Sequence, residues 1–428
     1  MNHEYHNQIN SFFRIFKPII FNLRQLIIMV VIALIIGASS GGVGILLYHA
    51  LAKVTVFRTD HPLILFLLPA GGLIIVFLYK VTDQFDNTGT NLILSAVQSN
   101  TFIPFRVAPL MFAATVITHL FGGSVGREGA ALQIGGSIGE TIAQRLNMDQ
   151  DDQHIVIMCA MSACFSAVFG TPVAAAIFSM EVISIGMMHY AALIPCVIAS
   201  ETAALLARRF GAIPEAFTIT EVPMFSFLNG GKIILAGIAL AGISVVFCIV
   251  LHLSEHLFKK YFRNPYLRIA VGGGMIILLT LLLRSRDYLG TSVPMIERCF
   301  ELGSIPFYAF AVKMIFTAIT LGAGYKGGEI VPSFVIGGTL GCLLGHILGF
   351  PPQLTTACGM VGVFCGVTNC PITSLLIAFE LFGFGGAPYY LVTIAVCYMM
   401  SGYYGLYSSQ SIVYSKHHEK LINRRVNK

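Results

Sequence analysis

An acidic residue within a glycine-rich segment is the first feature of the sequence that could do chemistry. Residues 122–129 read GGSVGREG, and a helix-favouring run follows from Ala130. Such a loop presents free backbone N–H groups at the positive end of a helix dipole, which is a ready site for an anion. Glu128 places a carboxylate where that anion would lie, until the carboxylate is protonated. The pattern therefore predicts an anion site for which the carboxylate competes, and the alternative is an acid that only caps a helix at the membrane interface.

A second glycine-rich segment carries another acidic residue. Residues 324–329 read GYKGGE, so that Glu329 stands three positions after Lys326. Ionisable groups at membrane depth are costly and commonly serve function. We expect Glu329 to line an ion or proton path, and the alternative is a structural ion pair with Lys326.

The composition places both segments in a membrane protein. Of the 428 residues, 56% are hydrophobic and 11% are charged, and the mean hydropathy is +0.80. A soluble chain would carry about a quarter charged residues, so this chain must be solvated by lipid. Glycine and proline interrupt several apolar stretches, for example at 37–42 and 69–72, which predicts an all-α fold with broken helices. Stretches long enough to cross all or half of a bilayer lie at 25–52, 62–79, 104–121, 154–180, 187–207, 232–252, 267–283, 306–322, 330–350, 356–382 and 388–404.

Charged residues indicate how the chain is oriented. Arg14, Lys17 and Arg24 precede the first span, and basic residues also follow the last one. Basic flanks remain in the cytoplasm, so both termini are expected there, in a multi-pass protein of the cell membrane. The same charges are expected to contact lipid and not nucleic acid. The cysteines and histidines are scattered without metal-ligand spacing, so we expect no metal and no other cofactor.

The sequence contains an internal repeat. IGGSIG at 134–139 matches IGGTLG at 336–341 with an offset of 202 residues, and the same offset places 122–129 over 324–331. Together with a second match further along each half, this match indicates a duplicated chain; the alternative is a chance resemblance of glycine-rich membrane segments.

The second match lies further along each half. Glu181 stands nine residues after Pro172, and Glu380 stands nine residues after Pro371. We expect structural roles for both acids, such as helix capping or buried hydrogen bonding.

The halves are expected to have opposite orientations in the membrane. The basic segment 253–268 should be cytoplasmic, so the second half would begin on the side opposite to the first. In inverted repeats the substrate site lies near the midplane, where broken helices from both halves meet. The predicted organisation is a cytoplasmic segment, a first repeat, a linker, a second repeat and a basic cytoplasmic tail, at 1–24, 25–210, 211–231, 232–412 and 413–428.

The motifs and their order resemble the CLC family of chloride channels and transporters. GREG at 126–129, followed by GxxxG spacing at 135–139, resembles the family signature GREGP, whose glutamate is the external gate and proton acceptor. FGTPVA at 169–174 resembles the FNAPLA segment, and Tyr407 resembles the tyrosine that coordinates the central ion. The resemblance implies a CLC-type inverted repeat, a homodimer with one pore per subunit, and transport instead of enzymatic activity.

Three departures from the chloride-transporting members are similar to the fluoride-exporting branch. Residues 89–93 read GTNLI in place of GSGIP, 324–329 resembles the GYKGGE stretch of that branch, and Val182 occupies the place of the internal proton glutamate. The resemblance therefore implies fluoride/proton antiport. A chloride channel or chloride/proton exchanger is the alternative, because the fluoride branch usually has other residues where Thr90 and Val331 stand.

The loops and the resemblance together define a candidate site. Glu128 and Glu329 are expected to gate the path and transfer protons. Contacts to the halide are expected from Gly89, Thr90, Asn91, Gly126, Arg127, Gly129, Ile330, Val331 and Tyr407. Fluoride is more tightly hydrated than chloride, so polar groups must replace its water, and the hydroxyls of Thr90 and Tyr407 can donate.

An intramembrane serine protease is an alternative from another class of protein. It is suggested by GASSG at 37–41. However, this segment lacks the usual spacing of a buried catalytic serine, and no histidine stands on an obvious partner helix.

Overall fold

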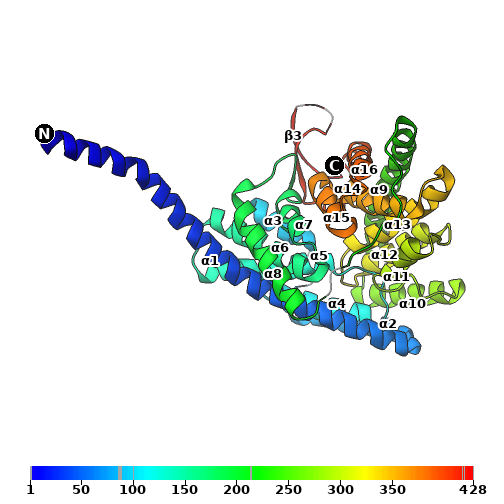
Figure 1. The fold of residues 1–428 in the computed structure, drawn as a ribbon. Helices are drawn as coiled ribbons and strands as arrows, with labels where there is room; N and C mark the ends of the chain where they lie inside the picture. The colour runs from blue at the N-terminus through cyan, green and yellow to red at the C-terminus, as the bar shows by residue number, and fades with distance from the viewer. Residues whose placement is uncertain are drawn as a thin grey trace.

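Helices make up most of the chain (Figure 1). The computed structural model describes the backbone of residues 2–84, 89–99, 101–212, 215–416, 418 and 420–427, and the side chains from residue 23 onward in these ranges. The predicted basic flank at Arg14 and Lys17 therefore has no described side chains. The first half contains α1 (Asn2–Asp60), the 3-10 helix η1 (Pro62–Leu67), α2 (Leu68–Val81), α3 (Thr90–Ser99), α4 (Val107–Leu120), α5 (Glu128–Arg145), α6 (Gln150–Phe169), α7 (Pro172–Glu181), the short 3-10 helix η2 (Tyr190–Ala192) and α8 (Leu193–Arg209). The second half contains α9 (Phe227–Tyr261), α10 (Pro265–Leu283), α11 (Val293–Glu301), α12 (Ala309–Ala323), α13 (Ile330–Leu348), α14 (Pro352–Thr368), α15 (Pro371–Phe382) and α16 (Ala387–Met400).

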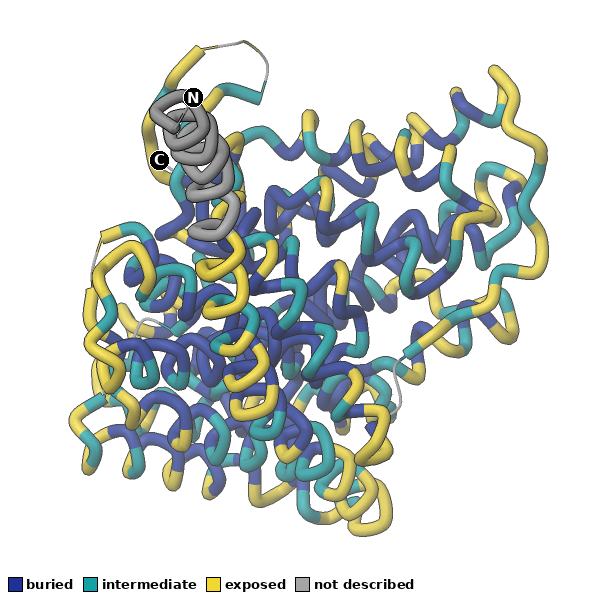
Figure 2. The backbone as a smooth tube through the Cα atoms, turned by 60° about the vertical axis from the view of Figure 1, so that its left-hand side comes forward, coloured by how far each residue is buried: buried dark blue, intermediate teal, exposed yellow. Residues whose placement is uncertain are grey.

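The arrangement agrees with the predicted multi-pass membrane fold. Seven spans in the described chain are long and apolar enough to cross a bilayer. Buried residues fill the interior of the helix bundle, whereas exposed residues lie on outer helix faces and loops (Figure 2). Many of the exposed side chains are large and apolar, such as Leu73, Ile74 and Phe77 on α2, as expected of a surface that faces lipid.

Two of the predicted spans are each divided into two helices at repeat-equivalent positions. The span 154–180 is α6 followed by α7, and the span 356–382 is α14 followed by α15. Gly170 ends α6 at a φ of +83°, and Asn369 ends α14 at a φ of +60°. These left-handed conformations stop a helix, and a proline in the first turn starts the next one in both cases.

Two other predicted interruptions are wrong. Residues 37–42 are helical within α1, and residues 69–72 are helical within α2. Gly37 and Gly41 instead allow α1 to pack directly against α8, because a side chain at either position would overlap that helix. The serine-protease alternative is not supported, because its segment 37–41 is helical and not a loop. Ser40 is buried, and its hydroxyl donates to a backbone carbonyl of α6 at 2.7 Å.

Glu181 and Glu380 cap helices of opposite halves. The carboxylate of Glu181 accepts hydrogen bonds from the backbone N–H groups of Ile372 and Thr373, at 3.1 and 2.8 Å, in the first turn of α15. The carboxylate of Glu380 accepts two from the first turn of α7, at 3.0 and 2.8 Å. The predicted structural role of both acids is therefore confirmed. Each half caps the N-terminal end of a helix in the other half.

A small sheet adds to the predicted all-α fold. Its strands are β1 (Ser184–Ile185), β2 (Ser411–Tyr414) and β3 (Leu421–Arg425), in the order β1-β2-β3. β1 and β2 are parallel, and β2 and β3 are antiparallel. The predicted boundary between the second repeat and the tail, at 412/413, falls inside β2. The sheet joins the end of the chain to the segment that follows α7, so it holds the C-terminal segment between the two halves.

Candidate functional site

The two glycine-rich segments pair with each other in the interior. We call residues 122–127 the first glycine loop and residues 324–329 the second glycine loop. Gly126 and Gly328 form two backbone hydrogen bonds with each other, at 2.6 and 2.8 Å. Because these loops lead directly into α5 and α13, the bridge brings the N-terminal ends of the two helices together. Two positive helix ends then face one small region, which favours a negative charge there.

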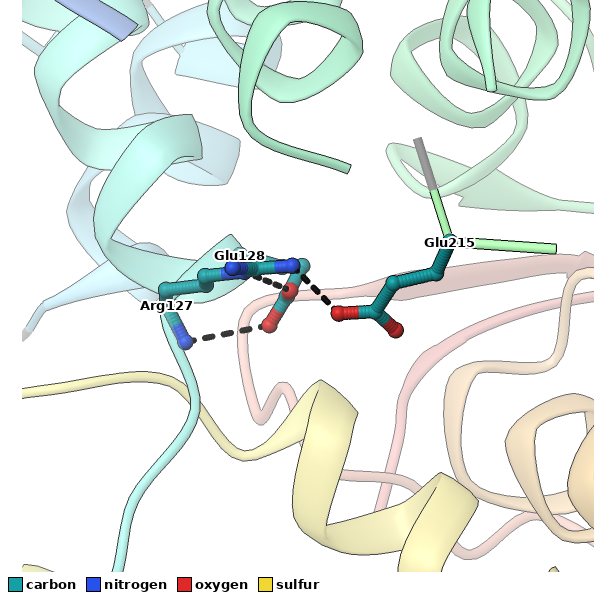
Figure 3. A network of polar contacts seen from close by, with 3 residues as sticks. All are labelled: Arg127, Glu128 and Glu215. Carbon is teal, nitrogen blue, oxygen red and sulfur yellow. Dashed lines mark hydrogen bonds and ion pairs between the residues drawn. The ribbon is translucent and has the colours of Figure 1, made fainter. Parts of the chain in front are cut away.

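Glu128 lies buried at the start of α5, with Arg127 beside it (Figure 3). Its Oε2 accepts a hydrogen bond from the backbone N–H of Arg127 at 3.0 Å. Its Oε1 lies 3.3 Å from Nε of the Arg127 guanidinium. The carboxylate therefore rests at the N-terminal end of a helix, where a free anion could also be held.

Arg127 has a second acidic partner that no sequence pattern indicated. Its Nη2 donates to Glu215 at 2.6 Å (Figure 3), and its guanidinium lies over the ring of Tyr48 at 5.4 Å. Glu215 comes from the segment between the halves, 88 positions along the chain. Arg127 thus keeps a carboxylate partner when Glu128 is neutral or displaced, which avoids a buried, unpaired cation.

A cavity of about 620 Å³, which we call the vestibule, lies beside the second glycine loop. Several predicted residues line it: Gly89, Thr90, Asn91, Glu329 and Tyr407. Charged residues of α9, α10 and the second glycine loop also line it: Glu255, Lys259, Arg268 and Lys326. Glu255 and Lys259 are exposed and pair with each other, so the vestibule opens on the face that carries the basic segment 253–268.

Tyr407 contributes to the vestibule a buried hydroxyl that lacks a well-formed hydrogen bond to any described residue. The hydroxyl is buried and has no hydrogen bond of ordinary geometry to a described residue, but the carboxylate of Glu329 lies close enough to interact with it. Leaving a buried polar group unsatisfied costs about 1–3 kcal/mol. A ligand that binds transiently in the cavity would accept a hydrogen bond from the hydroxyl and offset this cost.

Glu329 and Lys326 do not form the structural ion pair that was the alternative for this acid. Among the ion pairs of the described chain, none involves Glu329. The ammonium of Lys326 lies 4.6 Å above the ring of Tyr79 instead. The carboxylate of Glu329 therefore lies beside the vestibule without a counter-ion in the part of the chain that the structure describes.

Thr90 begins α3, and a residue that the sequence did not suggest holds it. The Thr90 hydroxyl oxygen accepts a hydrogen bond from Nε2 of Gln133 at 3.3 Å, and the same amide donates to the carbonyl of Gly129 at 3.3 Å. Gln133 thereby joins the starts of α3 and α5. Its place one helical turn after Gly129 was the available signal. The hydroxyl hydrogen of Thr90 bonds to no acceptor among the described residues.

The segment that carries Tyr407 is held by both halves. Oδ1 of Asn91 accepts the backbone N–H of Ser409 at 2.9 Å. The side-chain amide of Gln410 donates to the carbonyl of Val182 at 3.0 Å and to a carbonyl at the end of α14 at 2.8 Å. Val182 stands where chloride exchangers are expected to have an acid. It takes part in this network only through its backbone carbonyl, because its side chain is apolar.

The predicted site residues form two adjacent groups, and two residues lie outside them. Ile330 and Val331 are buried in the first turn of α13 and do not line the vestibule. The others surround the start of α5 or line the vestibule: Gly126, Arg127, Glu128 and Gly129 in the first group, and Gly89, Thr90, Asn91, Glu329 and Tyr407 in the second. The groups meet where Gly129 contacts Gly328 closely enough to exclude a side chain at either position.

Comparisons with known proteins assign the family. The sequence model described as voltage gated chloride channel matches residues 71–402. The chain is 34% identical to a chloride/fluoride channel protein of Pseudomonas syringae pv. tomato, over 91% of this chain and 87% of that protein. It is 25% identical to the H(+)/Cl(-) exchange transporter ClcA of Vibrio cholerae, over 65% of this chain and 62% of that protein.

Solved structures agree with this assignment. A CLC-type fluoride/proton antiporter superimposes with a TM-score of 0.87 at 30% identity, over 90% of this chain and 98% of that chain. A slow cyanobacterial Cl⁻/H⁺ antiporter superimposes with a TM-score of 0.74 at 19% identity, over 87% and 94% of the two chains, and this likeness concerns the fold alone. The chain is therefore a multi-pass anion transporter, not an enzyme, and it belongs to the voltage-gated chloride channel family, known as CLC.

Proposed function

We propose that the protein is a fluoride/proton antiporter that exports fluoride. One observation carries the proposal: the carboxylate of Glu128 rests at the positive end of α5, close to a vestibule that contains the unsatisfied hydroxyl of Tyr407. A solved structure described as a fluoride/proton antiporter shares the fold over nearly its whole length, which supports the choice of fluoride.

In the proposed cycle, proton and anion take turns at the start of α5. Ionised Glu128 occupies the anion position, and protonated Glu128 releases it, because a neutral carboxyl group loses its attraction to the helix end. Arg127 remains paired with Glu215 in both states. When the outside is more acidic than the cytosol, protons entering the cell drive the anion outward.

The vestibule is the proposed cytosolic half of the path. Thr90 and Tyr407 each have a hydroxyl hydrogen without a described acceptor, and both can replace water around a fluoride ion. Glu329 is proposed to carry protons between the vestibule and Glu128, because it lies near Tyr407 and has no ion-pair partner among the described residues.

Chloride is the second candidate substrate. Thr90 and Val331 differ from the residues usual in the fluoride branch, and the 34%-identical relative is described as a channel for chloride or fluoride. The same site would then act in a chloride channel or chloride/proton exchanger.

The remaining proposals concern assembly and orientation. We propose a homodimer with one path in each subunit, embedded in lipid and without a nucleic-acid partner. Each subunit would contain repeats at 25–210 and 232–412, joined by the linker 211–231. Both termini, the segment 1–24 and the tail 413–428, would lie in the cytoplasm on the side of the vestibule mouth.

Anion efflux from proteoliposomes with simultaneous proton recording tests the function. Wild-type protein is expected to release fluoride faster than chloride and to move protons in the opposite direction. Glu128→Gln cannot titrate and is expected to lose proton movement, whereas Glu301→Gln, at an exposed position on α11, should behave as wild type. Unchanged proton movement in Glu128→Gln would refute the role of Glu128, and no flux of either halide would refute the function.

A further inference from the structure

A second cavity lies on the face opposite the vestibule. It has a volume of about 300 Å³ and lies between the last turns of α1 and the segment that joins α10 to α11. α10 contributes Arg268 to the vestibule near its start and ends at Leu283, and a helix of this length spans about 28 Å. The second cavity, which we call the outer pocket, is therefore about one membrane span away from the vestibule.

Arg58 lines the outer pocket as a partly buried cation without an acidic partner among the described residues. Its Nη1 donates to the carbonyl of His119 at 2.7 Å, and its other N–H groups bond to no described residue. None of the ion pairs of the described chain includes Arg58. A planar guanidinium with unused donors suits the oxygens of a carboxylate or a phosphate group.

A second cation lines the same pocket. Arg286 lines it, is exposed, and makes no ion pair with a described residue. Lys313 does not line the pocket but is fully buried behind its wall, where Nζ donates to Oγ of Ser292 at 2.8 Å. The only acidic residue of the lining, among the described residues, is Asp287, and it accepts hydrogen bonds of 3.0 and 2.5 Å from the guanidinium of Arg298. The pocket thus has excess cationic charge.

We propose that the outer pocket binds a phosphate group, either of a lipid headgroup or of free phosphate. The guanidinium groups of Arg58 and Arg286 face its oxygens, and hydroxyls of Thr55, Thr59 and Thr291 supply neutral donors. The cavity is larger than a single halide needs and has room for a tetrahedral oxyanion. The exposed, apolar end of α10 borders the pocket, so a lipid headgroup can reach it from the membrane surface.

An occupant of the outer pocket would also stabilise the first glycine loop. The backbone N–H of Gly290 donates to the carbonyl of Gly123 at 3.1 Å. Lys313 donates to Ser124 at 2.9 Å as well as to Ser292, so it joins the loop to the pocket wall. An occupant that orders the pocket wall would therefore also order the first glycine loop, through the Gly290–Gly123 hydrogen bond and through Lys313.

Thermal unfolding of the full-length protein tests the site. In delipidated protein in a non-ionic detergent, sodium phosphate is compared with sodium gluconate at equal ionic strength. A saturating concentration of phosphate is expected to raise the unfolding temperature of wild type by about 2–4 °C. The shift should be lost in Arg58→Met and strongly reduced in Arg286→Gln. Arg284→Gln is the control, because Arg284 is exposed nearby but outside the lining.

A lipid arm distinguishes the two sources of the phosphate group. Nanodiscs of phosphatidylglycerol are compared with nanodiscs of a galactolipid, which has no phosphate. Stabilisation by phosphatidylglycerol that Arg286→Gln abolishes identifies a headgroup site, and stabilisation by free phosphate alone identifies a site for the soluble ion. The proposal is overturned when neither source stabilises wild type, or when wild type and Arg286→Gln shift equally. Arg286→Gln keeps the test decisive, because Arg286 makes no structural hydrogen bond through its side chain to a described residue.

Discussion

The backbone N–H of Ser409 donates to Oδ1 of Asn91 at 2.9 Å, and this bond ties the segment of Tyr407 to the start of α3. The two residues are 318 positions apart in the sequence. A second bond supports the contact, since the hydroxyls of Ser95 and Ser409 lie 3.0 Å apart. The first half of the chain therefore sets the position of a hydroxyl that belongs to the second half.

Substitutions of Asn91 should separate its structural effect from its electrostatic effect. Asn91→Ala leaves the Ser409 N–H without an acceptor and is expected to cost about 1–2 kcal/mol of stability. Asn91→Asp keeps an acceptor oxygen and should remain folded, but its negative charge should slow halide efflux about tenfold or more. Unfolding in denaturant and proteoliposome efflux measure the two effects. Efflux at the wild-type rate in Asn91→Asp would contradict the placement of Asn91 beside the anion path.

Removal of the Tyr407 hydroxyl should weaken anion binding without loss of stability. The hydroxyl is buried and has no hydrogen bond of ordinary geometry to a described residue, so Tyr407→Phe should be as stable as wild type or more stable by up to about 1 kcal/mol. A hydrogen bond to an ion contributes about 1.5–3 kcal/mol, so the fluoride affinity should fall about tenfold to a hundredfold. Isothermal titration with fluoride measures the change.

Tyr390 provides a matched control for this experiment. Its hydroxyl is also buried without a described partner, but the residue does not line the vestibule. Tyr390→Phe should keep the wild-type fluoride affinity. A similar loss of affinity in both variants would show that the effect is not specific to the vestibule.

Glu329→Gln should impair proton coupling and leave the fold intact. Since Glu329 has no ion-pair partner among the described residues, its neutralisation leaves no unpaired cation behind. We expect an unchanged unfolding temperature and at least a tenfold lower proton flux for each transported fluoride. Parallel fluoride-electrode and pH recordings give this ratio. A large loss of stability with an unchanged flux ratio would assign a structural role to Glu329.

The sequence could predict the features that depend on local pattern. The repeat offset of 202 places Gly126 over Gly328, and the structure bonds these two residues to each other. The helix breaks near Pro172 and Pro371 also follow from local pattern, because glycine or asparagine before a proline ends one helix and starts another. The glycines at 37–42 show the limit of this reasoning, since glycine permits close packing as readily as it permits a break.

Features that depend on contact between distant segments could not be predicted. Glu215 reaches Arg127 from a segment without a motif, and Gln133 acts through a contact with Thr90 on another helix. Lys313 is a single lysine in an apolar helix, and only the structure shows its hydrogen bonds. The strands have two to five residues, which is too short for a clear alternation of polar and apolar positions.

Gly328→Ala should disrupt the bridge between the two glycine loops. An added Cβ would lie 2.5 Å from the backbone nitrogen of Gly129, and neither backbone can move away without breaking the pair of hydrogen bonds with Gly126. We expect a loss of about 2–4 kcal/mol of stability, and loss of both halide and proton flux. Gly274→Ala is the control, because its Cβ would meet no atom within 4 Å on α10, and alanine there should stabilise the helix by about 0.5–1 kcal/mol. Transport at the wild-type rate in Gly328→Ala would contradict the idea that the bridge holds α5 and α13 in place around the anion.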